Sequence, residues 1–195
     1  MRYRVILASA SKRRSKILKE CGIPHRVVVS GSSEKMDHKR SAGFNVLYNA
    51  AAKARQVAEK QKDGFVIGAD TVVLLGKRLI GKPKTKKEAR ALLKAFSGKT
   101  IFVYTGICLI NAAEEKSARA VEVSKIQVKK LSRKRIDEFM KMTSPHDKAG
   151  GFSIEGPGAF IFDNIKGSFY NILGLSPARL CELFEKLGVN ICRMT

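Results

Sequence analysis

Residues 64–83 read Gly-Phe-Val-Ile-Gly-Ala-Asp-Thr-Val-Val-Leu-Leu-Gly-Lys-Arg-Leu-Ile-Gly-Lys-Pro, and this stretch decides the fold that we predict. Two short apolar runs, 65–67 and 72–75, are punctuated by glycine, which is typical of buried strands. Asp70 lies between them, and we predict that it stands at a strand end or a bulge, where its side chain can face a cleft. The alternative is a tight β-hairpin in which Asp70 caps a turn. This stretch alone does not separate the two.

The composition indicates one sizeable core or two small lobes. The chain has 195 residues, of which 44% are hydrophobic. No apolar run approaches the length of a membrane span, and the first residues lack an apolar stretch with a cleavage site, so we expect no membrane association and no signal peptide. Four cysteines are scattered without metal-ligand spacing, which favours free thiols in a reducing compartment. We therefore predict a cytoplasmic protein.

The strong positive charge indicates an anionic partner. The chain holds 38 Lys and Arg against 17 Asp and Glu, a formal net charge of +21, and such a surface attracts nucleic acids or phosphorylated small molecules. The alternative is a basic surface that reflects only the general composition of the host's proteins. Much of the excess is dispersed on helix faces, as at Lys86, Lys87, Arg90 and Lys94, and aromatic residues do not alternate with basic ones. These features disfavour specific nucleic-acid binding.

Apolar periodicity along the rest of the chain predicts an α/β fold. We predict further strands over 4–8, 24–30, 100–110 and 118–130, and helices over 11–22, 41–62, 85–97, 132–142 and 178–187. The apolar phase of 118–130 switches between Val123 and Ile126, which indicates a bulge or sharp bend. The glycine-dense block over 147–175 indicates ordered loops. Two long adjacent strands, one of them bent, predict an elongated mixed β-sheet with flanking helices that joins two lobes.

We predict an anion cradle where the first strand meets the first helix. The strand runs into Ser9 and Ser11, and Ser11 is a good N-cap for the helix that follows. Two hydroxyls, free backbone N–H groups, the positive end of the helix dipole, and the side chains of Arg13 and Arg14 are all available to an anion there. The alternative is an ordinary capped helix with solvated arginines. Because cations oppose the dipole at a helix N-terminus, the two arginines favour the cradle.

Lysines and carboxylates elsewhere add to a candidate phosphate site. Lys53 lies on an apolar stripe of the long second helix, where a lysine either snorkels outward, the commoner case, or reaches into a site. Lys82 precedes a proline and so stands on a stiff backbone. The candidate acids are Glu34, Asp70 and Glu155, although an isolated acid in a polar loop, such as Glu34, is usually solvated. Cations for phosphates, with carboxylates for a hard metal and a water, are what phosphoanhydride hydrolysis needs.

Several linked motifs occur in order along the chain. They are Leu-Ala-Ser-Ala-Ser-x-Arg-Arg (7–14), Gly-Ala-Asp-Thr-Val-Val (68–73), Gly-Lys-Pro (81–83), Ser-Gly-Lys-Thr with Val-Tyr-Thr-Gly (97–106), Lys-Ala-Gly-Gly-Phe-x-Ile-x-Gly (148–156) and Asn-Ile-Leu-Gly-Leu (171–175). By these motifs the chain resembles the Maf family of nucleotide pyrophosphatases over essentially its whole length. We therefore predict a single Maf-like domain over residues 1–195.

The resemblance implies a two-lobed α/β fold, similar to that of the inosine triphosphate pyrophosphatases, with the active site in the cleft. It also implies hydrolysis of nucleoside triphosphates to the monophosphate and pyrophosphate, with Mg²⁺ or Mn²⁺ as cofactor. Asp70 matches the family's proton acceptor, and Glu34 and Asp70 are the metal ligands that we expect. The expected substrate-binding residues, from the cradle and from the matching positions, are Ser9, Ser11, Arg13, Arg14, Lys53, Thr71, Lys82 and Glu155.

Two positions depart from the family pattern. Lys12 stands where the family usually has proline, a change that would loosen the loop without removing the cradle. Glu155 stands where the branch acting on dTTP and UTP has glutamine, and it is closer to the branch acting on 7-methyl-GTP. Arg13 and Thr71 fit the dTTP and UTP branch instead. The base preference therefore stays open.

Two functions remain in competition. The leading hypothesis is a metal-dependent nucleoside triphosphate pyrophosphatase for pyrimidine or modified nucleotides. Its expected partners are the nucleotide substrate and a second copy of the chain in a homodimer. The alternative is a basic nucleic-acid-binding or cell-division regulatory protein with a nucleotide pocket. The net charge supports the alternative, whereas Asp70, Lys82 and the two adjacent arginines favour the enzyme.

Overall fold

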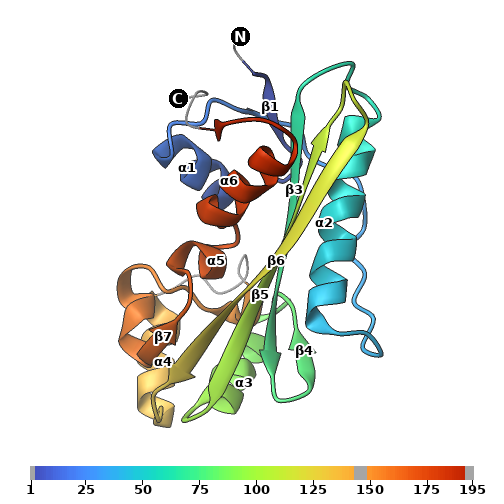
Figure 1. Cartoon of the computed structure of the whole chain (residues 1–195). Coiled ribbons are helices and arrows are strands. Elements are labelled where there is room, and N and C mark those ends of the chain that lie inside the picture. Colours follow the sequence, from blue (N-terminus) through green and yellow to red (C-terminus); the bar gives the residue numbers. More distant parts are fainter. Residues whose placement is uncertain (1–2, 143–148, 192–195) are drawn as a thin grey trace.

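The computed structural model describes residues 3–142 and 149–191, which form a seven-stranded mixed sheet flanked by helices (Figure 1). The strands are β1 (Val5–Leu7), β2 (Arg26–Val27), β3 (Phe65–Leu75), β4 (Arg78–Ile80), β5 (Thr100–Asn111), β6 (Lys116–Val128) and β7 (Phe162–Lys166). The helices are α1 (Lys12–Glu20), α2 (Ala42–Ala58), α3 (Lys86–Phe96), α4 (Arg133–Met142), α5 (Phe169–Leu173) and α6 (Pro177–Lys186), with the short 3₁₀ helices η1 (Ala149–Gly151) and η2 (Gly156–Ile161).

The sheet is built around three long strands. The order is β2-β1-β3-β5-β6-β7, with β4 paired to β3; β1 runs parallel to β2 and β3, and the other pairs are antiparallel. β1, α1 and α6 lie toward one end of β3, β5 and β6, while β4, α3 and α4 lie toward the other (Figure 1). The predicted elongated mixed sheet with flanking helices is confirmed.

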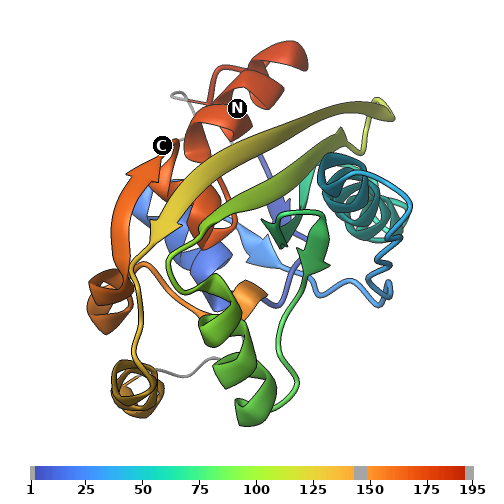
Figure 2. The same ribbon diagram turned by 90° about the horizontal axis from the view of Figure 1, so that it is seen from below.

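The helices are divided between the two faces of the sheet. α2 packs on one face, against Val66 and Val72 of β3. On the other face, α1, α3, α5 and α6 share a larger apolar core with Ile67 and Val73 of the same strand (Figure 2). Because successive strand residues point to opposite faces, β3 contributes side chains to both layers.

Along its middle, β3 has a neighbouring strand on one side only. Within the described part of the chain, β1 pairs with residues 65–67 and β4 with 73–75, which leaves 68–72 bonded to β5 alone. Asp70 stands in this gap, opposite Gly106 of β5. The predicted strand end or bulge is therefore wrong, and so is the alternative of a turn, because Asp70 lies inside one continuous strand.

Two glycines allow α2 to lie close to the sheet. A Cβ atom on Gly68 would lie 2.1 Å from the backbone oxygen of Ala50, and one on Gly106 would lie 2.5 Å from the backbone carbon of Val46. A packed interior does not accommodate such overlaps, so these two strand positions require glycine. Gly68, two residues before Asp70, therefore allows the close packing of α2 and does not break the strand. The close approach also brings polar side chains of α2 within hydrogen-bond distance of Asp70.

The predicted irregularity in β6 lies elsewhere. β6 pairs with β5 without a shift from residue 116 to 127, so there is no bulge between Val123 and Ile126. The apolar pattern changes there because Val121 packs toward α2, while the polar Ser124 is buried. The register shifts only near the end of β6, at residues 127–128, where it pairs with β7.

Two other predicted segments also differ. The strand predicted over 24–30 is reduced to β2, whose two residues are exposed at the edge of the sheet. The block over 147–175, predicted as loops, contains β7 and α5, while its first two residues lie outside the described part of the chain. Within residues 3–142 and 149–191, no helix combines the length and the apolar character needed to cross a membrane.

Candidate active site

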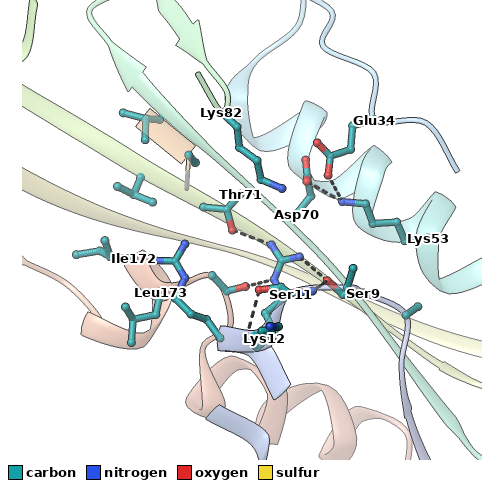
Figure 3. Close-up of a pocket in the computed structure, with 18 of the residues that line it drawn as sticks. Ser9, Ser11, Lys12, Glu34, Lys53, Asp70, Thr71, Lys82, Ile172 and Leu173 are labelled. Atoms are coloured by element: carbon teal, nitrogen blue, oxygen red, sulfur yellow. Dashed lines mark hydrogen bonds and ion pairs between the residues drawn. The ribbon is translucent and has the colours of Figure 1, made fainter. Parts of the chain in front are cut away.

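A pocket of about 520 Å³ opens at the gap along β3 (Figure 3). Asp70 and Thr71 point to opposite faces of the sheet, yet both line the pocket, because no strand of the described chain pairs with this edge of β3 at residues 68–72. Every predicted site residue except Glu155 lines it: Ser9, Ser11, Arg13, Arg14, Glu34, Lys53, Asp70, Thr71 and Lys82. The structure thus brings together residues from five separate segments of the sequence, and their individual roles stay predictions.

The predicted cradle forms at the start of α1. Ser11 is the N-cap, and its Oγ accepts a hydrogen bond from the backbone N–H of Arg14 at 3.4 Å. The Oγ of Ser9 accepts from the backbone N–H of Ser11 at 3.2 Å. The two hydroxyls and the first turn of α1 therefore face the pocket as one unit. Because the N-terminus of a helix carries partial positive charge, this unit suits a phosphate group.

Arg14 connects three walls of the pocket. Its buried guanidinium donates from Nε to the backbone oxygen of Gly174 at 2.8 Å, from Nη1 to Ser9 Oγ at 3.1 Å, and from Nη2 to Thr71 Oγ1 at 3.1 Å. Burial lowers the pKa of Arg14 from its usual value, although the charges of Asp70 and Glu34 act in the opposite direction. A guanidinium has five N–H groups, so donors remain for a ligand after these three bonds.

Three more cations line the pocket beside Arg14 and Lys53, namely Lys12, Arg13 and Lys82. Within the described residues, Arg13 and Lys82 make no hydrogen bond or ion pair with another side chain, and both line the pocket. Figure 3 shows the Lys82 side chain extending toward Asp70. An unpaired cation beside a cavity favours an anionic ligand, because the ligand supplies the missing counter-charge.

Lys53 stands between two carboxylates. Its Nζ lies 2.7 Å from Glu34 Oε1 and 2.9 Å from Asp70 Oδ1, and the side chain of Asp70 is almost fully buried (Figure 3). Lys53 therefore reaches into the site. The commoner case, in which such a lysine snorkels outward, does not apply here. Partial burial on its own raises the pKa of Glu34, but the hydrogen bond and charge of Lys53, with the charges of Lys82 and Arg14, outweigh it and lower that pKa.

Sequence reasoning missed two buried asparagines of α2. Asn49 donates from Nδ2 to Asp70 Oδ2 at 2.9 Å, and Asn45 lies one turn earlier on the same side of the helix. Both also bond to the backbone of the loop that carries Glu34. The signal was present in the sequence: Asn45, Asn49 and Lys53 are spaced four residues apart, which makes one polar stripe on a helix that is otherwise rich in alanine.

A chain of buried polar groups fixes the opposite wall. Thr71 Oγ1 lies 3.0 Å from Thr105 Oγ1, which donates to the backbone oxygen of Asn171 at 2.8 Å. The Asn171 amide in turn donates to the backbone oxygen of Val103 at 3.1 Å and to Ser124 Oγ at 2.8 Å. These bonds attach α5 to β5 and β6, and so place its pocket-lining residues. Sequence reasoning did not identify Thr105, Asn171 or Ser124.

Glu155 is the predicted site residue that does not line the pocket. It is half-buried at the position before η2, and its neighbours Ser153 and Ile154 provide the pocket wall instead. The backbone N–H of Glu155 donates to Ser153 Oγ at 3.2 Å, which forms a local turn there. The expected role of Glu155 in substrate binding therefore finds no support in the pocket lining.

The donor set fits a divalent metal that is shared with a phosphorylated ligand. Among the described residues, no group of three or more His, Cys, Asp or Glu side chains could hold a metal ion by itself. The pocket does offer the carboxylates of Glu34 and Asp70 on either side of one cation, Lys53 Nζ. Mg²⁺ is commonly held by one or two carboxylates and completed by substrate phosphates and waters. Glu34 and Asp70 therefore meet the requirement for such a metal.

These features define an α/β protein with a pocket for a small polyanion: its described lining includes five cationic side chains and two carboxylates. Residues 4–187 match the family described as Maf-like protein, and the chain belongs to this family. A protein of Dictyoglomus thermophilum named dTTP/UTP pyrophosphatase is 37% identical over 98% of this chain and 100% of its own length. A Bacillus cereus protein of the same name is 36% identical over 96% of this chain and 97% of its own length.

Two solved structures are more distantly similar. A nucleoside-triphosphatase, or dITP/XTP pyrophosphatase, of Mycobacterium abscessus is 13% identical, with a TM-score of 0.45, over 95% of this chain and 90% of that chain. The Ham1 protein of Staphylococcus aureus is 11% identical, with a TM-score of 0.47, over 92% of this chain and 90% of that chain. Similarity at this level adds nothing to the fold described above.

Proposed function

We propose that the protein is a nucleoside triphosphate pyrophosphatase that hydrolyses dTTP and UTP to the monophosphate and pyrophosphate. The central observation is a buried carboxylate, Asp70, in a pocket lined mainly by cations. The printed name of full-length relatives at 36–37% identity, dTTP/UTP pyrophosphatase, supports the substrate class. The two observations are independent, because the first comes from geometry and the second from sequence similarity.

The triphosphate would bind along the cradle. The hydroxyls of Ser9 and Ser11 and the first N–H groups of α1 would donate to phosphate oxygens, and Arg13 and Lys82 would supply the unpaired positive charges. Preorganised donors of this kind stabilise the charge that develops on pyrophosphate as it leaves. Because Arg14 is already fixed by three hydrogen bonds, it contributes charge from a rigid position.

Asp70 would act as the proton acceptor for the attacking water. Each of its oxygens accepts one hydrogen bond, from Lys53 or from Asn49, and each carboxylate oxygen has a second lone pair that is free to accept the proton. A divalent metal, Mg²⁺ or Mn²⁺, held by Glu34 and Asp70 would neutralise phosphate charge and make a bound water more acidic. Water would then attack the α-phosphorus, and the departing pyrophosphate would lie against the cations of the cradle.

A panel of nucleoside triphosphates tests this proposal. Purified protein with Mg²⁺ or Mn²⁺ should release pyrophosphate and monophosphate, with dTTP and UTP as the best substrates. If orthophosphate and diphosphate are the first products, the proposed chemistry is wrong. Omission of the metal, with a chelator present, should abolish turnover.

The alternative function rests on the net charge of +21. A nucleic-acid-binding protein should retain affinity for random duplex DNA at physiological salt, whereas a nucleotide hydrolase with a basic surface should lose it as salt rises. A salt titration of DNA binding therefore separates the two functions. The homodimer and the cytoplasmic location stay predictions, which measurement of the molecular mass in solution and localisation of a tagged protein can test.

A further inference from the structure

We propose that Asn49 is a positioning residue that holds the Asp70 carboxylate and the loop carrying Glu34 in one fixed arrangement. The inference rests on the proposed function, in which Asp70 accepts the proton. Asn49 is 4% exposed and is not among the residues that line the pocket, so it would not touch the substrate. Its effect on the reaction would pass through Asp70.

The Asn49 amide uses both of its donors and its acceptor. Nδ2 donates to Asp70 Oδ2 at 2.9 Å and to the backbone oxygen of Lys35 at 2.9 Å, while Oδ1 accepts from the backbone N–H of Lys35 at 2.9 Å. A backbone N–H can only donate, so the amide oxygen must face Lys35. The orientation of the amide is therefore determined by its partners, and its nitrogen must face Asp70.

The hydrogen bond from Asn49 fixes the rotation of the Asp70 carboxylate, which the bond from Lys53 alone leaves free. The ammonium of Lys53 donates to Asp70 Oδ1 and can follow the carboxylate as it rotates, because an ammonium has three equivalent donors on a flexible stem. A second donor on Oδ2, fixed in a planar amide, sets the plane of the carboxylate. The free lone pairs of Asp70 then keep a constant direction into the pocket.

The same amide connects this carboxylate to Glu34. Lys35 directly follows Glu34, so the two backbone bonds from Asn49 locate the segment from which Glu34 reaches Lys53 at 2.7 Å. Alanine, aspartate and serine do not offer this combination at the position. Alanine removes all three bonds, aspartate removes both donors and places a second negative charge beside Asp70, and serine is too short to bridge the loop and the strand.

Asn45 provides a matched control on the same helix. Its Oδ1 accepts from the backbone N–H of Asp37 at 2.7 Å, and its Nδ2 donates to the backbone oxygens of Asp37 and Ser41, both at 2.9 Å. It thus clamps the same loop with the same kind of bonds, but it does not contact Asp70. A purely structural role of the asparagines predicts similar effects for both; a positioning role predicts a difference.

The kinetic test compares Asn49→Ala with Asn45→Ala, using UTP and dTTP. We expect Asn49→Ala to lower kcat on the order of 30- to 100-fold, as for a misplaced catalytic group, with KM within about threefold of wild type. Asn45→Ala should lower kcat by less than about threefold. Trypsin cleavage at Lys35 and Lys39 should increase in both variants, which shows equal loosening of the loop. Equal losses of kcat in the two variants, or a rise in KM alone, would overturn the proposal.

A crystal structure of Asn49→Ala tests the positioning without any turnover. The proposal requires the Asp70 carboxylate to rotate or to occupy more than one orientation while the backbone of β3 stays in place. A carboxylate that keeps its wild-type orientation overturns the proposal even if activity falls. If Asn49→Ala does not fold, Asn49→Ser replaces it in both tests. If the wild type releases no pyrophosphate from any nucleotide, the proposed function fails, and the crystal structure still decides whether Asn49 positions Asp70.

Discussion

Replacement of Gly68 by alanine should both destabilise the protein and misplace its catalytic groups. The new Cβ would lie 2.1 Å from the backbone oxygen of Ala50, 2.8 Å from the backbone nitrogen of Ala54 and 2.9 Å from the Ala54 Cβ. The first two obstacles are backbone atoms, so no side-chain rotation relieves them. α2 must move away from β3 by at least about 1 Å to relieve the overlap. Overpacking of this kind costs typically 1–3 kcal/mol and occasionally more, and we expect about 3 kcal/mol.

The two consequences are measured separately. For a chain of this length, 3 kcal/mol corresponds to a fall in Tm of about 6–12 °C by calorimetry. The same movement draws Asn49 and Lys53 away from Asp70, which they contact at 2.9 Å. Because a misplacement of about 1 Å can cost on the order of 100-fold in rate, kcat for pyrophosphate release should fall by roughly that factor at temperatures where the variant is still folded.

Two other glycines sharpen this experiment. Gly106→Ala should act like Gly68→Ala, since its Cβ would lie 2.5 Å from the backbone carbon of Val46 in the same helix. Gly43→Ala is the matched control on α2: the nearest atoms to its Cβ are side-chain carbons of Val121 at 3.9 Å, and alanine favours a helix. This control should be neutral or slightly stabilising. A Gly68→Ala variant with a Tm within 2 °C of wild type and unchanged kcat would refute the explanation of the close helix packing.

Three further outcomes follow from the site. Asp70→Asn should lower kcat by several orders of magnitude with an unchanged circular dichroism spectrum; more than about a tenth of wild-type turnover, a barrier change below ~1.4 kcal/mol, would show that Asp70 is not catalytic. Because the folded-state pKa of Glu34 is lowered, Glu34 should stabilise the fold above its unfolded pKa of about 4.3 and lose that contribution as pH falls through the folded value. The Tm difference between wild type and Glu34→Gln should therefore shrink as pH falls below about 4, and a pH-independent difference would contradict this. Glu155→Gln should change kcat/KM for UTP, CTP and GTP by one common factor, since Glu155 does not line the pocket; a selective gain for UTP would show that Glu155 reads the base.

The sequence predicted the positions that can be recognised locally. Ser11 caps α1 as expected, and Thr85 caps α3 in the same way, because such interactions span only a few residues. The cradle could therefore be located from its own residues. Asp70, Glu34 and Lys82 were candidates on chemical grounds, and the resemblance supplied their expected roles. For Lys53, chemical reasoning alone favoured the surface over a site.

What the sequence did not predict depends on contacts between distant segments. Gly68 was interpreted as a break between two short apolar runs, whereas it lies inside β3 and lets α2 pack close to the strand. No local sequence pattern contains this contact with α2. The buried hydrogen bond between Thr105 and Asn171 joins positions 66 residues apart, so the local motifs that contain the two residues give no sign of it. Asn49 is the exception, since its spacing from Lys53 on an apolar helix was visible in the sequence.

The gap in β3 explains why two motifs far apart in the sequence serve one ligand. After Leu7, the chain turns away from β3 at Ser9 and begins the cradle. After Ile80, continued antiparallel pairing would bring Lys82 opposite Thr71 and Pro83 opposite Asp70, but proline cannot donate to a strand ladder, and the chain leaves. Each departure puts cations beside the uncovered edge: Arg13 and Arg14 from one side, Lys82 from the other. In a fully paired strand, Asp70 and Thr71 would be separated by a neighbouring backbone and could not contact the same small molecule. The pocket therefore follows from where β1 and β4 stop, and any change that prolongs either strand along residues 68–72 should close it.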